Sequence, residues 1–269
     1  LYDCQRNHQP VLAIASHIPS SEIGLGYFQE THPTELFREC SHFCEMVQHP
    51  HQLPELLHRA MRTAIGERGV AVLVLPGDVC TLDAPEGARP HFAQPAPARL
   101  LPDPEALAEL AKLLNGSKAV TILAGAGTQG AHDEVVALAQ ALAAPVVHAF
   151  RGKETMEWDN PCDVGMTGLI GFSSGYHAMR ECDTLVMLGT DFPYRNFYPE
   201  DAAVAQIDRN PGALGRRAQL RLGLVADVRE AARLLAPLIE PGRDTAFLEK
   251  AQDPPTDQIN AGCYVFRRS

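Results

Sequence analysis

The chain has 269 residues, of which 45% are hydrophobic and 21% charged. At roughly 150 residues per domain this length corresponds to about two globular domains, and the composition excludes a disordered or collagen-like chain. The net charge of −10, without a basic stripe, argues against nucleic acid or an anionic membrane surface as the main partner.

The first block of the sequence has the order strand, helix, strand. Residues 11–16 and 70–75 (VAVLVL) are short apolar runs rich in β-branched residues, which is typical of strands covered on both faces. Between them, residues 53–65 place leucine, methionine and isoleucine at helical spacing. We therefore expect a parallel α/β unit.

Prolines separate this block from the next. Six prolines fall between residues 83 and 104, with few long apolar side chains and no sustained helical period. Such a segment cannot donate a full ladder of backbone hydrogen bonds. It predicts an extended interdomain linker, which we place at residues 86–103.

After the linker, strands and helices alternate regularly, which predicts a doubly wound parallel sheet. In such sheets a ligand binds beyond the carboxyl ends of the strands, here residues 125–130, 148–153, 189–194 and 208–210. The predicted strands are residues 119–123, 146–149, 184–188, 204–207 and 220–225. The predicted helices are residues 104–114, 132–142, about 175–181 and 228–238.

Residues 125–130 (GAGTQG) form a G-x-G-x-x-G motif between a predicted strand and a predicted helix. This context favours a nucleotide whose phosphates meet the helix N-terminus, and the alternative is a tight turn without a ligand. An NAD site also needs an acidic residue after the next strand, where this chain has Arg151 and Lys153. Plain NAD is therefore disfavoured, and an NADP-binding reductase remains an alternative.

Three other segments could contact a ligand. Asp208 ends a strand and could accept hydrogen bonds from an adenosine ribose or cap a turn. Residues 189–194 combine glycine, a hydroxyl and aromatic rings, which suits either a flat ring or an aromatic loop core. Residues 165–175 contain four glycines, a density that indicates close approach of the backbone to a ligand or another chain.

The sequence offers no recognisable catalytic group or metal site. Cys40 and Cys44 lack a second ligand pair, and the histidines of the first block lack a partner nucleophile or carboxylate. The seven scattered cysteines suit reduced thiols in a cytoplasmic protein. Because the chain lacks an initial methionine and soon enters a predicted strand, we expect it to be a piece of something longer.

Five segments carry a family resemblance: residues 15–24 (ASHIPSSEIG), 26–33 (GYFQETHP), 75–79 (LPGDV), 163–171 (DVGMTGLIG) and 192–195 (FPYR). They resemble the bacterial pyruvate dehydrogenases (quinone), or pyruvate oxidases, which are flavin-containing members of the thiamine-diphosphate enzyme family. The resemblance runs over residues 1–251.

This resemblance implies a particular domain organisation. Residues 1–85 are expected to be the C-terminal half of a pyrimidine-binding thiamine diphosphate domain, and residues 104–241 a central FAD-binding domain. Residues 242–269 form an atypical tail, of the kind a frameshift or truncation produces. The glutamate that activates thiamine and the domain that binds diphosphate and Mg²⁺ are expected outside the chain, so the isolated chain is expected to be inactive.

The resemblance also implies a function. The parent enzyme is expected to oxidise pyruvate to acetate and CO₂, passing electrons through FAD to a quinone, as a homotetramer with peripheral membrane contact through a C-terminal part not present here. Alternatives are an acetolactate synthase or carboligase of the same superfamily, or a truncation without a stable fold. The expected thiamine-pocket residues are Phe28 and Gln29. The expected FAD contacts are Gly125, Gly127, Thr167, Gly168, Leu169, Ile170, Thr190, Asp191, Phe192, Pro193, Tyr194 and Asp208.

Overall fold

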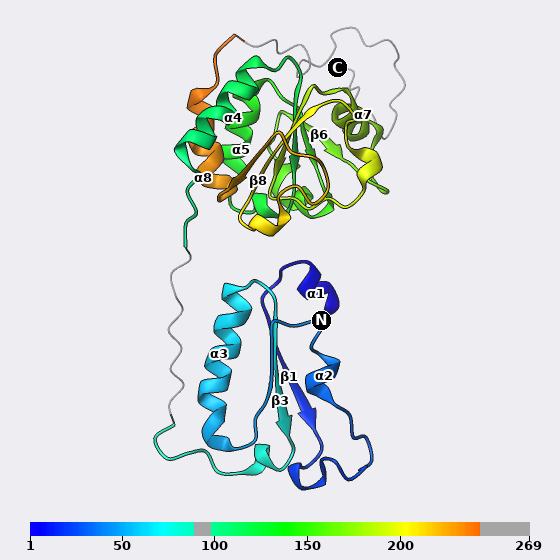
Figure 1. The fold of residues 1–269 in the computed structure, drawn as a ribbon, viewed down its shortest axis with the longest axis vertical. Helices are drawn as coiled ribbons and strands as arrows, with labels where there is room; N and C mark the ends of the chain where they lie inside the picture. The colour runs from blue at the N-terminus through cyan, green and yellow to red at the C-terminus, as the bar shows by residue number, and fades with distance from the viewer. Residues whose placement is uncertain (89–97, 243–269) are drawn as a thin grey trace. The chain divides into compact units, whose positions relative to one another are not determined.

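The computed structural model describes residues 1–88 and 98–242 and divides the chain into two compact units, Leu1–Pro97 and Ala98–Ser269 (Figure 1). The division falls in the predicted linker, whose residues 89–97 lie outside the described residues, as does the predicted tail from residue 243 onward. Among the described helices, none is long and apolar enough to cross a membrane.

Unit 1 contains a three-stranded parallel sheet in the order β1-β3-β2. The central strand β3 has β-branched and leucine side chains at nearly every position, and almost all of them are buried. The strands are β1 (Val11–His17), β2 (Phe43–Met46) and β3 (Val70–Pro76). The helices are α1 (Tyr2–Arg6), α2 (Pro33–Leu36) and α3 (Leu53–Gly66), with short 3₁₀ turns at Ser20–Glu22, Pro50–Gln52 and Val79–Thr81.

Alternate residues of β3 face two different clusters. Ala71 and Leu73 pack with the leucines of α3, and Val72 packs on the other face with side chains that include Phe37. The edge strand β1 is covered less well, because Ile14, the register partner of Leu73, is 63% exposed. Helix α3 therefore covers the middle of this sheet better than its β1 edge.

Unit 2 contains a six-stranded parallel sheet in the order β6-β5-β4-β7-β8-β9. Its strands are β4 (Val120–Ala124), β5 (Val146–His148), β6 (Asp163–Met166), β7 (Thr184–Leu188), β8 (Ala203–Asp208) and β9 (Leu222–Val225). Its helices are α4 (Pro104–Gly116), α5 (His132–Leu142), α6 (Lys153–Met156), α7 (Ser173–Glu181) and α8 (Val228–Leu235). Short 3₁₀ turns lie at Ala126–Thr128, Phe150–Gly152, Arg195–Phe197, Pro211–Ala213 and Ala236–Leu238.

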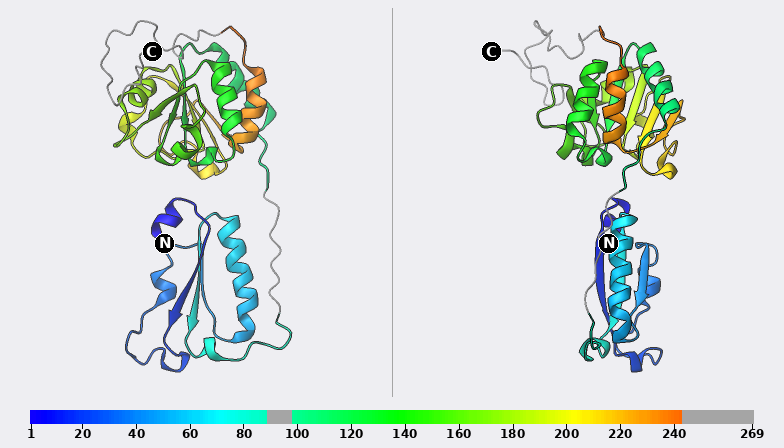
Figure 2. Two further views of the ribbon diagram at one scale, coloured as in Figure 1. Left: turned by 180° about the vertical axis from the view of Figure 1, so that it is seen from behind. Right: turned by 90° about the vertical axis from the view of Figure 1, so that its left-hand side faces the viewer.

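Helices cover both faces of this sheet (Figure 2). On one face α4, α5 and α8 bury side chains such as Ile122, Val186 and Ile207. On the other face α7 covers their strand neighbours Leu123 and Met187. Because consecutive strand residues face opposite sides, two helical layers require continuous apolar strands, as the sequence predicts. The predicted parallel α/β fold is confirmed.

Two strands, β2 and β6, were not predicted from the sequence. Strand β2 is only four residues long and half-buried, and β6 contains an aspartate and a glycine. The pairing of β5 with β6 is also irregular, because the register shifts between Val146 and His148. Neither strand has the apolar run that marks a central strand, so periodicity alone does not reveal them.

Candidate functional site

The order of the sheet in unit 2 fixes its topological switch point, the position at which doubly wound folds have a crevice. Numbered within the unit, the strands run 3-2-1-4-5-6, so the chain leaves β4 toward one side and β7 toward the other. Ligands of doubly wound proteins bind at this switch point, beyond the carboxyl ends of the two central strands. The turns that begin at Gly125 and Gly189 lie there, one after each strand.

These two turns are in direct backbone contact. The Gly127 N–H donates to the carbonyl oxygen of Gly189 over 2.9 Å. A Cβ atom on Gly127 would lie 2.6 Å from the Gly189 Cα atom, and one on Gly125 would lie 2.5 Å from the Gly189 carbonyl oxygen. A side chain at either position would force the turns apart. Close packing of two turns therefore accounts for these glycines.

The amide groups of the first turn are largely used within the protein. Gly125 donates to the Leu188 carbonyl, and Thr128 donates to the carbonyl of Gly125. The N–H groups of Gln129 and Ala131 are satisfied in the same way, by carbonyl groups of the turn itself. A phosphate bound at this motif would therefore have to be held mainly by the first N–H groups of α5. The predicted flavin contacts of Gly125 and Gly127 stay predictions.

The loop after β6 exposes apolar side chains. Leu169 is 71% exposed and Ile170 67% exposed, although both are large aliphatic residues. Gly168 has φ +110°, a backbone conformation that favours glycine, and the Phe192 ring lies against it. The Thr167 hydroxyl is buried without a hydrogen-bond partner in the described structure. An apolar ligand or protein surface would remove Leu169 and Ile170 from water.

The loop after β7 contributes aromatic rings. Phe192 is 5% exposed, and its ring centroid lies 5.4 Å from that of Tyr194. The Tyr198 hydroxyl donates to the Phe192 carbonyl over 2.8 Å. Phe192 thus belongs to an aromatic loop core, whereas Tyr194 is 41% exposed. Of the two interpretations of this segment, the aromatic core describes Phe192, and Tyr194 remains available to line a flat ring. Pro193 is exposed and Thr190 is buried.

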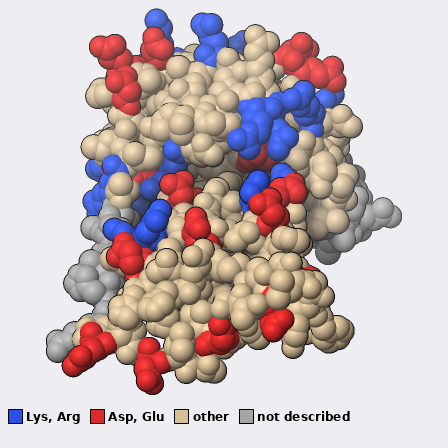
Figure 3. Space-filling view, turned by 60° about the horizontal axis from the view of Figure 1, so that its bottom comes forward, with Lys and Arg blue, Asp and Glu red and all other residues tan. Residues whose placement is uncertain are grey.

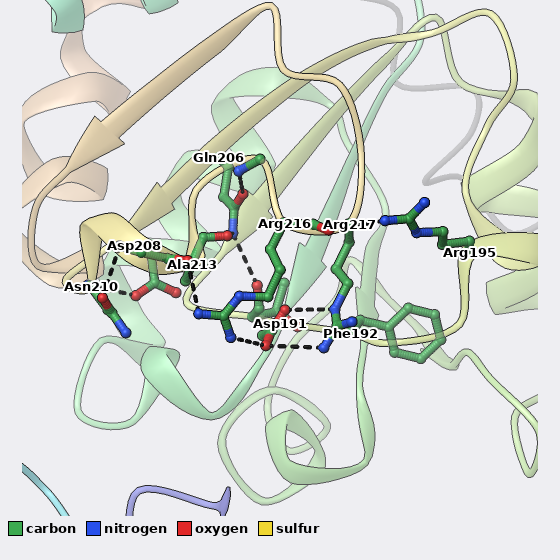
Figure 4. A network of polar contacts seen from close by, with 12 residues as sticks. Asp191, Phe192, Arg195, Gln206, Asp208, Asn210, Ala213, Arg216 and Arg217 are labelled. Atoms are coloured by element: carbon green, nitrogen blue, oxygen red, sulfur yellow. Dashed lines mark hydrogen bonds and ion pairs between the residues drawn. The ribbon is translucent and has the colours of Figure 1, made fainter.

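Asp191 is held by two arginines from the connection between β8 and β9 (Figure 4). Arg216 Nη1 donates to Asp191 Oδ2 over 2.8 Å, and Arg217 Nε donates to Oδ1 over 2.8 Å. Gln206, 2% exposed, donates to the carbonyls of Thr190 and Ala213 and so ties the same two loops together. The carboxylate of Asp191 is therefore engaged with cations of its own chain.

Asp208 lies at the carboxyl end of β8 and caps the turn that follows. Its Oδ1 atom accepts the N–H of Asn210 over 2.8 Å. The turn-cap interpretation of Asp208 is therefore observed, and its predicted contact with an adenosine ribose stays a prediction. Gln206, Arg216 and Arg217 were not among the predicted site residues. For the two arginines a signal exists in the sequence, because residues 209–221 contain four arginines and no acidic residue.

A buried ionisable pair lies at the edge of the sheet. His148 Nε2 and Asp163 Oδ1 are 3.4 Å apart, and His148 is 1% exposed. Burial lowers the pKa of His148 and raises the pKa of Asp163 to about 6, against a smaller lowering by the Gly165 N–H. Both shifts favour the uncharged forms, which is the ordinary consequence of desolvation.

The predicted thiamine-pocket residues lie on an exposed loop of unit 1. Phe28 is 80% exposed, and Gln29 has φ +65°. The loop is held by Glu30, whose carboxylate accepts the N–H groups of Gly24 and Gly26, and these bonds lower the pKa of Glu30. Among the described residues no three His, Cys, Asp or Glu side chains gather as a metal site.

Basic side chains gather in groups on the face shown in Figure 3, with acidic side chains beside them. The contacts within unit 2 place Arg195, Arg216 and Arg217 together around Asp191: both Arg216 and Arg217 pair with its carboxylate, and Arg195 Nη2 donates to the Arg216 carbonyl over 3.2 Å. Positive charge is therefore in local excess around Asp191, although the whole chain has a net charge of −10.

Comparison with known proteins identifies the class that unit 2 resembles. Residues 107–235 match the family model of the thiamine pyrophosphate enzyme, central domain. Unit 2 is therefore similar to the central domain of thiamine pyrophosphate enzymes. A solved structure provisionally described as a thiamin diphosphate-dependent enzyme from Mycobacterium smegmatis shares this fold, with a TM-score of 0.74 and 21% identity over 91% of this chain and 49% of that one.

Curated relatives match nearly the whole chain. An uncharacterised 42.6 kDa protein from the isoamylase 3′ region of Pseudomonas amyloderamosa is 58% identical over 93% of this chain and 63% of its own length. YdaP of Bacillus subtilis (strain 168), provisionally named as thiamine pyrophosphate-containing, is 37% identical over 92% of this chain and 43% of its own length. The chain thus spans about two fifths to three fifths of these relatives.

The finer resemblance to pyruvate oxidases is not distinguished by these matches. The pyruvate oxidase of Lactiplantibacillus plantarum is 24% identical to this chain, and the sulfoacetaldehyde acetyltransferase of Rhodobacter capsulatus is 32% identical. What these matches share is a similarity to thiamine pyrophosphate enzymes, and the reaction needs a separate argument.

Proposed function

We propose that the crevice of unit 2 binds FAD, as part of a thiamine diphosphate- and Mg²⁺-dependent enzyme that oxidatively decarboxylates pyruvate to acetate and passes the electrons to a quinone. The observation that carries the FAD proposal is the exposed apolar pair Leu169 and Ile170, on a glycine-flanked loop at the edge of the sheet where ligands of this fold bind. Binding sites for cofactors are mostly apolar and bury most of the ligand surface.

The residues fit such a ligand in three respects. Leu169 and Ile170 would leave water on contact with a flat ring, and Tyr194 offers a partly exposed aromatic face. Asp208 places a carboxylate at the end of β8, on the side of the sheet where ligands of this fold bind. When bound, FAD would supply the electron-accepting chemistry and thiamine diphosphate the decarboxylation chemistry. The part of the described residues would be to bind and orient the flavin and keep water from it.

Fluorescence titration of FAD into the chain tests the proposal. We expect saturable quenching of the flavin, with affinity weakened about tenfold in Leu169→Ser because an apolar contact is removed. Leu36→Ser, which changes a leucine of unit 1 that is 61% exposed, is the control and should leave FAD affinity unchanged. Tight NADPH binding without FAD binding would instead support the reductase alternative.

A second candidate is group transfer. The acetyltransferase of Rhodobacter capsulatus and the probable acetolactate synthase of Methanocaldococcus jannaschii are 32% and 30% identical to this chain, more than the 24% of the pyruvate oxidase. Anaerobic addition of pyruvate to the longer Bacillus subtilis relative, loaded with FAD, thiamine diphosphate and Mg²⁺, separates the two. Loss of the oxidised flavin spectrum supports the oxidase, and a flavin that stays oxidised supports transfer.

Assembly and location are proposals of the same kind. A homotetramer with peripheral membrane contact on the cytoplasmic side follows from the resemblance to the oxidases. Light scattering and vesicle flotation of the longer relative would test both, and a monomer that stays in solution would contradict them.

A further inference from the structure

We propose that Arg216 and Arg217, held together by Asp191 and flanked by Arg195, form a binding site for the phosphate groups of a nucleotide at the mouth of the unit 2 crevice. The inference extends the proposed function by naming the group that recognises the anionic part of the cofactor. Its central residues, Arg216 and Arg217, are not among those to which the sequence resemblance gives a role.

The distribution of charge is the first observation. Residues 209–221 contain four arginines and no aspartate or glutamate, although the chain as a whole carries a net charge of −10. Arg209 is paired with Asp227, so its charge is locally neutralised. Arg216 and Arg217 share the single carboxylate of Asp191. With Arg195 this group has three positive charges and one negative charge.

The geometry of the arginines is the second observation (Figure 4). Arg217 Nε and Nη2 donate to the two oxygens of Asp191 over 2.8 and 3.3 Å. Arg216 Nη1 donates to Asp191, and its Nη2 donates to the Gly212 carbonyl over 2.8 Å. Among the contacts of the described chain, neither Arg216 Nε nor Arg217 Nη1 has a hydrogen-bond partner. The two side chains are 44% and 30% exposed.

The arginines are also ordered before any ligand arrives. Gln206 Oε1 accepts the Gly215 N–H over 3.0 Å, and Gln206 Nε2 donates to the Ala213 carbonyl, so the loop that carries both arginines is fixed to β8. Immobilising a long side chain on binding costs about 0.5–1.5 kcal/mol of conformational free energy. Because this loop is fixed in the free protein, much of that free energy is not lost when a ligand binds. An ordered pair of arginines is therefore expected to bind an anion more tightly than flexible arginines on an exposed surface would.

The position of Arg216 and Arg217 indicates which class of ligand they would bind. Asp191 follows Gly189, the residue that contacts Gly127 at the switch point, so the guanidinium groups lie close to the crevice. Guanidinium groups bind phosphate through paired, charge-assisted hydrogen bonds. A nucleotide and free phosphate share this chemistry, and an attached nucleoside distinguishes them by its contacts with the rest of the crevice.

Isothermal titration with adenosine, ADP and inorganic phosphate tests the proposal. We expect the wild-type chain to bind ADP more than tenfold tighter than adenosine, with the difference shrinking as salt rises. Arg217→Gln should weaken ADP binding about tenfold and leave adenosine binding unchanged. Arg221→Gln removes a charge from the same loop without touching Asp191 and should change neither. Equal weakening of ADP and adenosine by Arg217→Gln would overturn the proposal.

Asp191→Asn distinguishes two roles of the arginine cluster, phosphate binding and holding the loops together, because the two predict different changes in ADP affinity. If the arginines bind phosphate, removing the competing carboxylate preserves or strengthens ADP binding. If Asp191 and the arginines only hold the loops, the same substitution weakens ADP and adenosine alike, and the proposal is wrong. FAD binding without any effect of Arg217→Gln would refute this site alone. ADP binding that depends on Arg217 without FAD binding would refute the FAD proposal alone.

Discussion

Gly127→Ala is the sharpest test of how the crevice is built. The added Cβ atom would lie 2.6 Å from the Gly189 Cα atom and 3.0 Å from the Gly189 carbonyl oxygen. Carbon atoms in ordinary contact are about 3.5–4.0 Å apart, so the two turns must separate by roughly 1 Å. That movement also stretches the 2.9 Å hydrogen bond from Gly127 to Gly189. The clash involves backbone on the Gly189 side, so no side chain can rotate to relieve it.

The size of the effect follows from these two losses. Overpacking of a close-packed interior costs about 1–3 kcal/mol, and a weakened buried hydrogen bond costs about 1 kcal/mol. We therefore expect the free energy of unfolding of unit 2 to fall by about 2–4 kcal/mol. For a domain of this size, that corresponds to a fall in Tm of roughly 5–15 °C.

Trp158 makes the assay specific to unit 2. It is the only tryptophan of the sequence and stacks on His132, with ring centroids 3.9 Å apart. Urea unfolding followed by tryptophan fluorescence therefore reports this unit without interference from the other. Gly116→Ala is the matched control, because its Cβ meets nothing within 4 Å, and we expect it to be neutral or to stabilise by up to about 1 kcal/mol.

The packing explanation has a clear point of failure. If Gly127→Ala unfolds within about 0.5 kcal/mol of the wild type, the turns do not depend on this contact and the explanation is refuted. A variant of normal stability that loses FAD binding would show that the glycine serves the approach of a ligand instead.

Three further predictions follow from burial. Leu73→Ala should destabilise unit 1 by about 2–5 kcal/mol and Ile14→Ala by less than about 1 kcal/mol, measured by thermal circular dichroism, although the two residues are register partners; equal costs would mean that Ile14 is covered in solution. Burial raises the pKa of Asp163 to about 6, so the folded chain retains a proton that the unfolded chain releases, and its stabilising contribution is lost as pH rises through about 6. Asp163→Asn should therefore raise the urea midpoint more at about pH 7.5 than at about pH 5, and a pH-independent gain would contradict the shift. Iodoacetamide with peptide mapping should label exposed Cys80 and spare buried Cys162, whose pKa burial raises to about 11; early labelling of Cys162 would show that its strand edge opens.

Much of the fold of unit 2 can be predicted because its strands are continuous apolar runs. Helix α5 begins and ends where its helical period does, at His132 and Leu142, and β7 matches its apolar run as well. Strand β6 could not be found in this way, because Asp163 and Gly165 interrupt any apolar pattern and its pairing is set by the tertiary structure. The sequence could predict elements where the hydrophobic effect alone decides them.

The candidate site was predicted less completely, for a physical reason. Each predicted segment lies at a strand end, which the alternation of elements fixes. The side-chain partners depend on contacts across about 25 residues of sequence, as between Asp191 and Arg216. No local sequence pattern predicts that a carboxylate will pair with arginines of a distant loop. The prediction for Asp191, a flavin contact, therefore depended on its neighbours Phe192 and Tyr194. The arginine-rich composition of the loop was the available clue.

The irregular strand β6 has a consequence for the behaviour of the protein in a crowded solution. It forms an edge of the six-stranded sheet, and the unpaired backbone groups of a regular edge strand invite another chain to add its own strand. The register shift against β5, together with Gly165 at φ +92°, bends this edge away from the flat geometry that strand addition needs. A substitution that straightened β6 would favour aggregation even if it left every contact of the crevice intact.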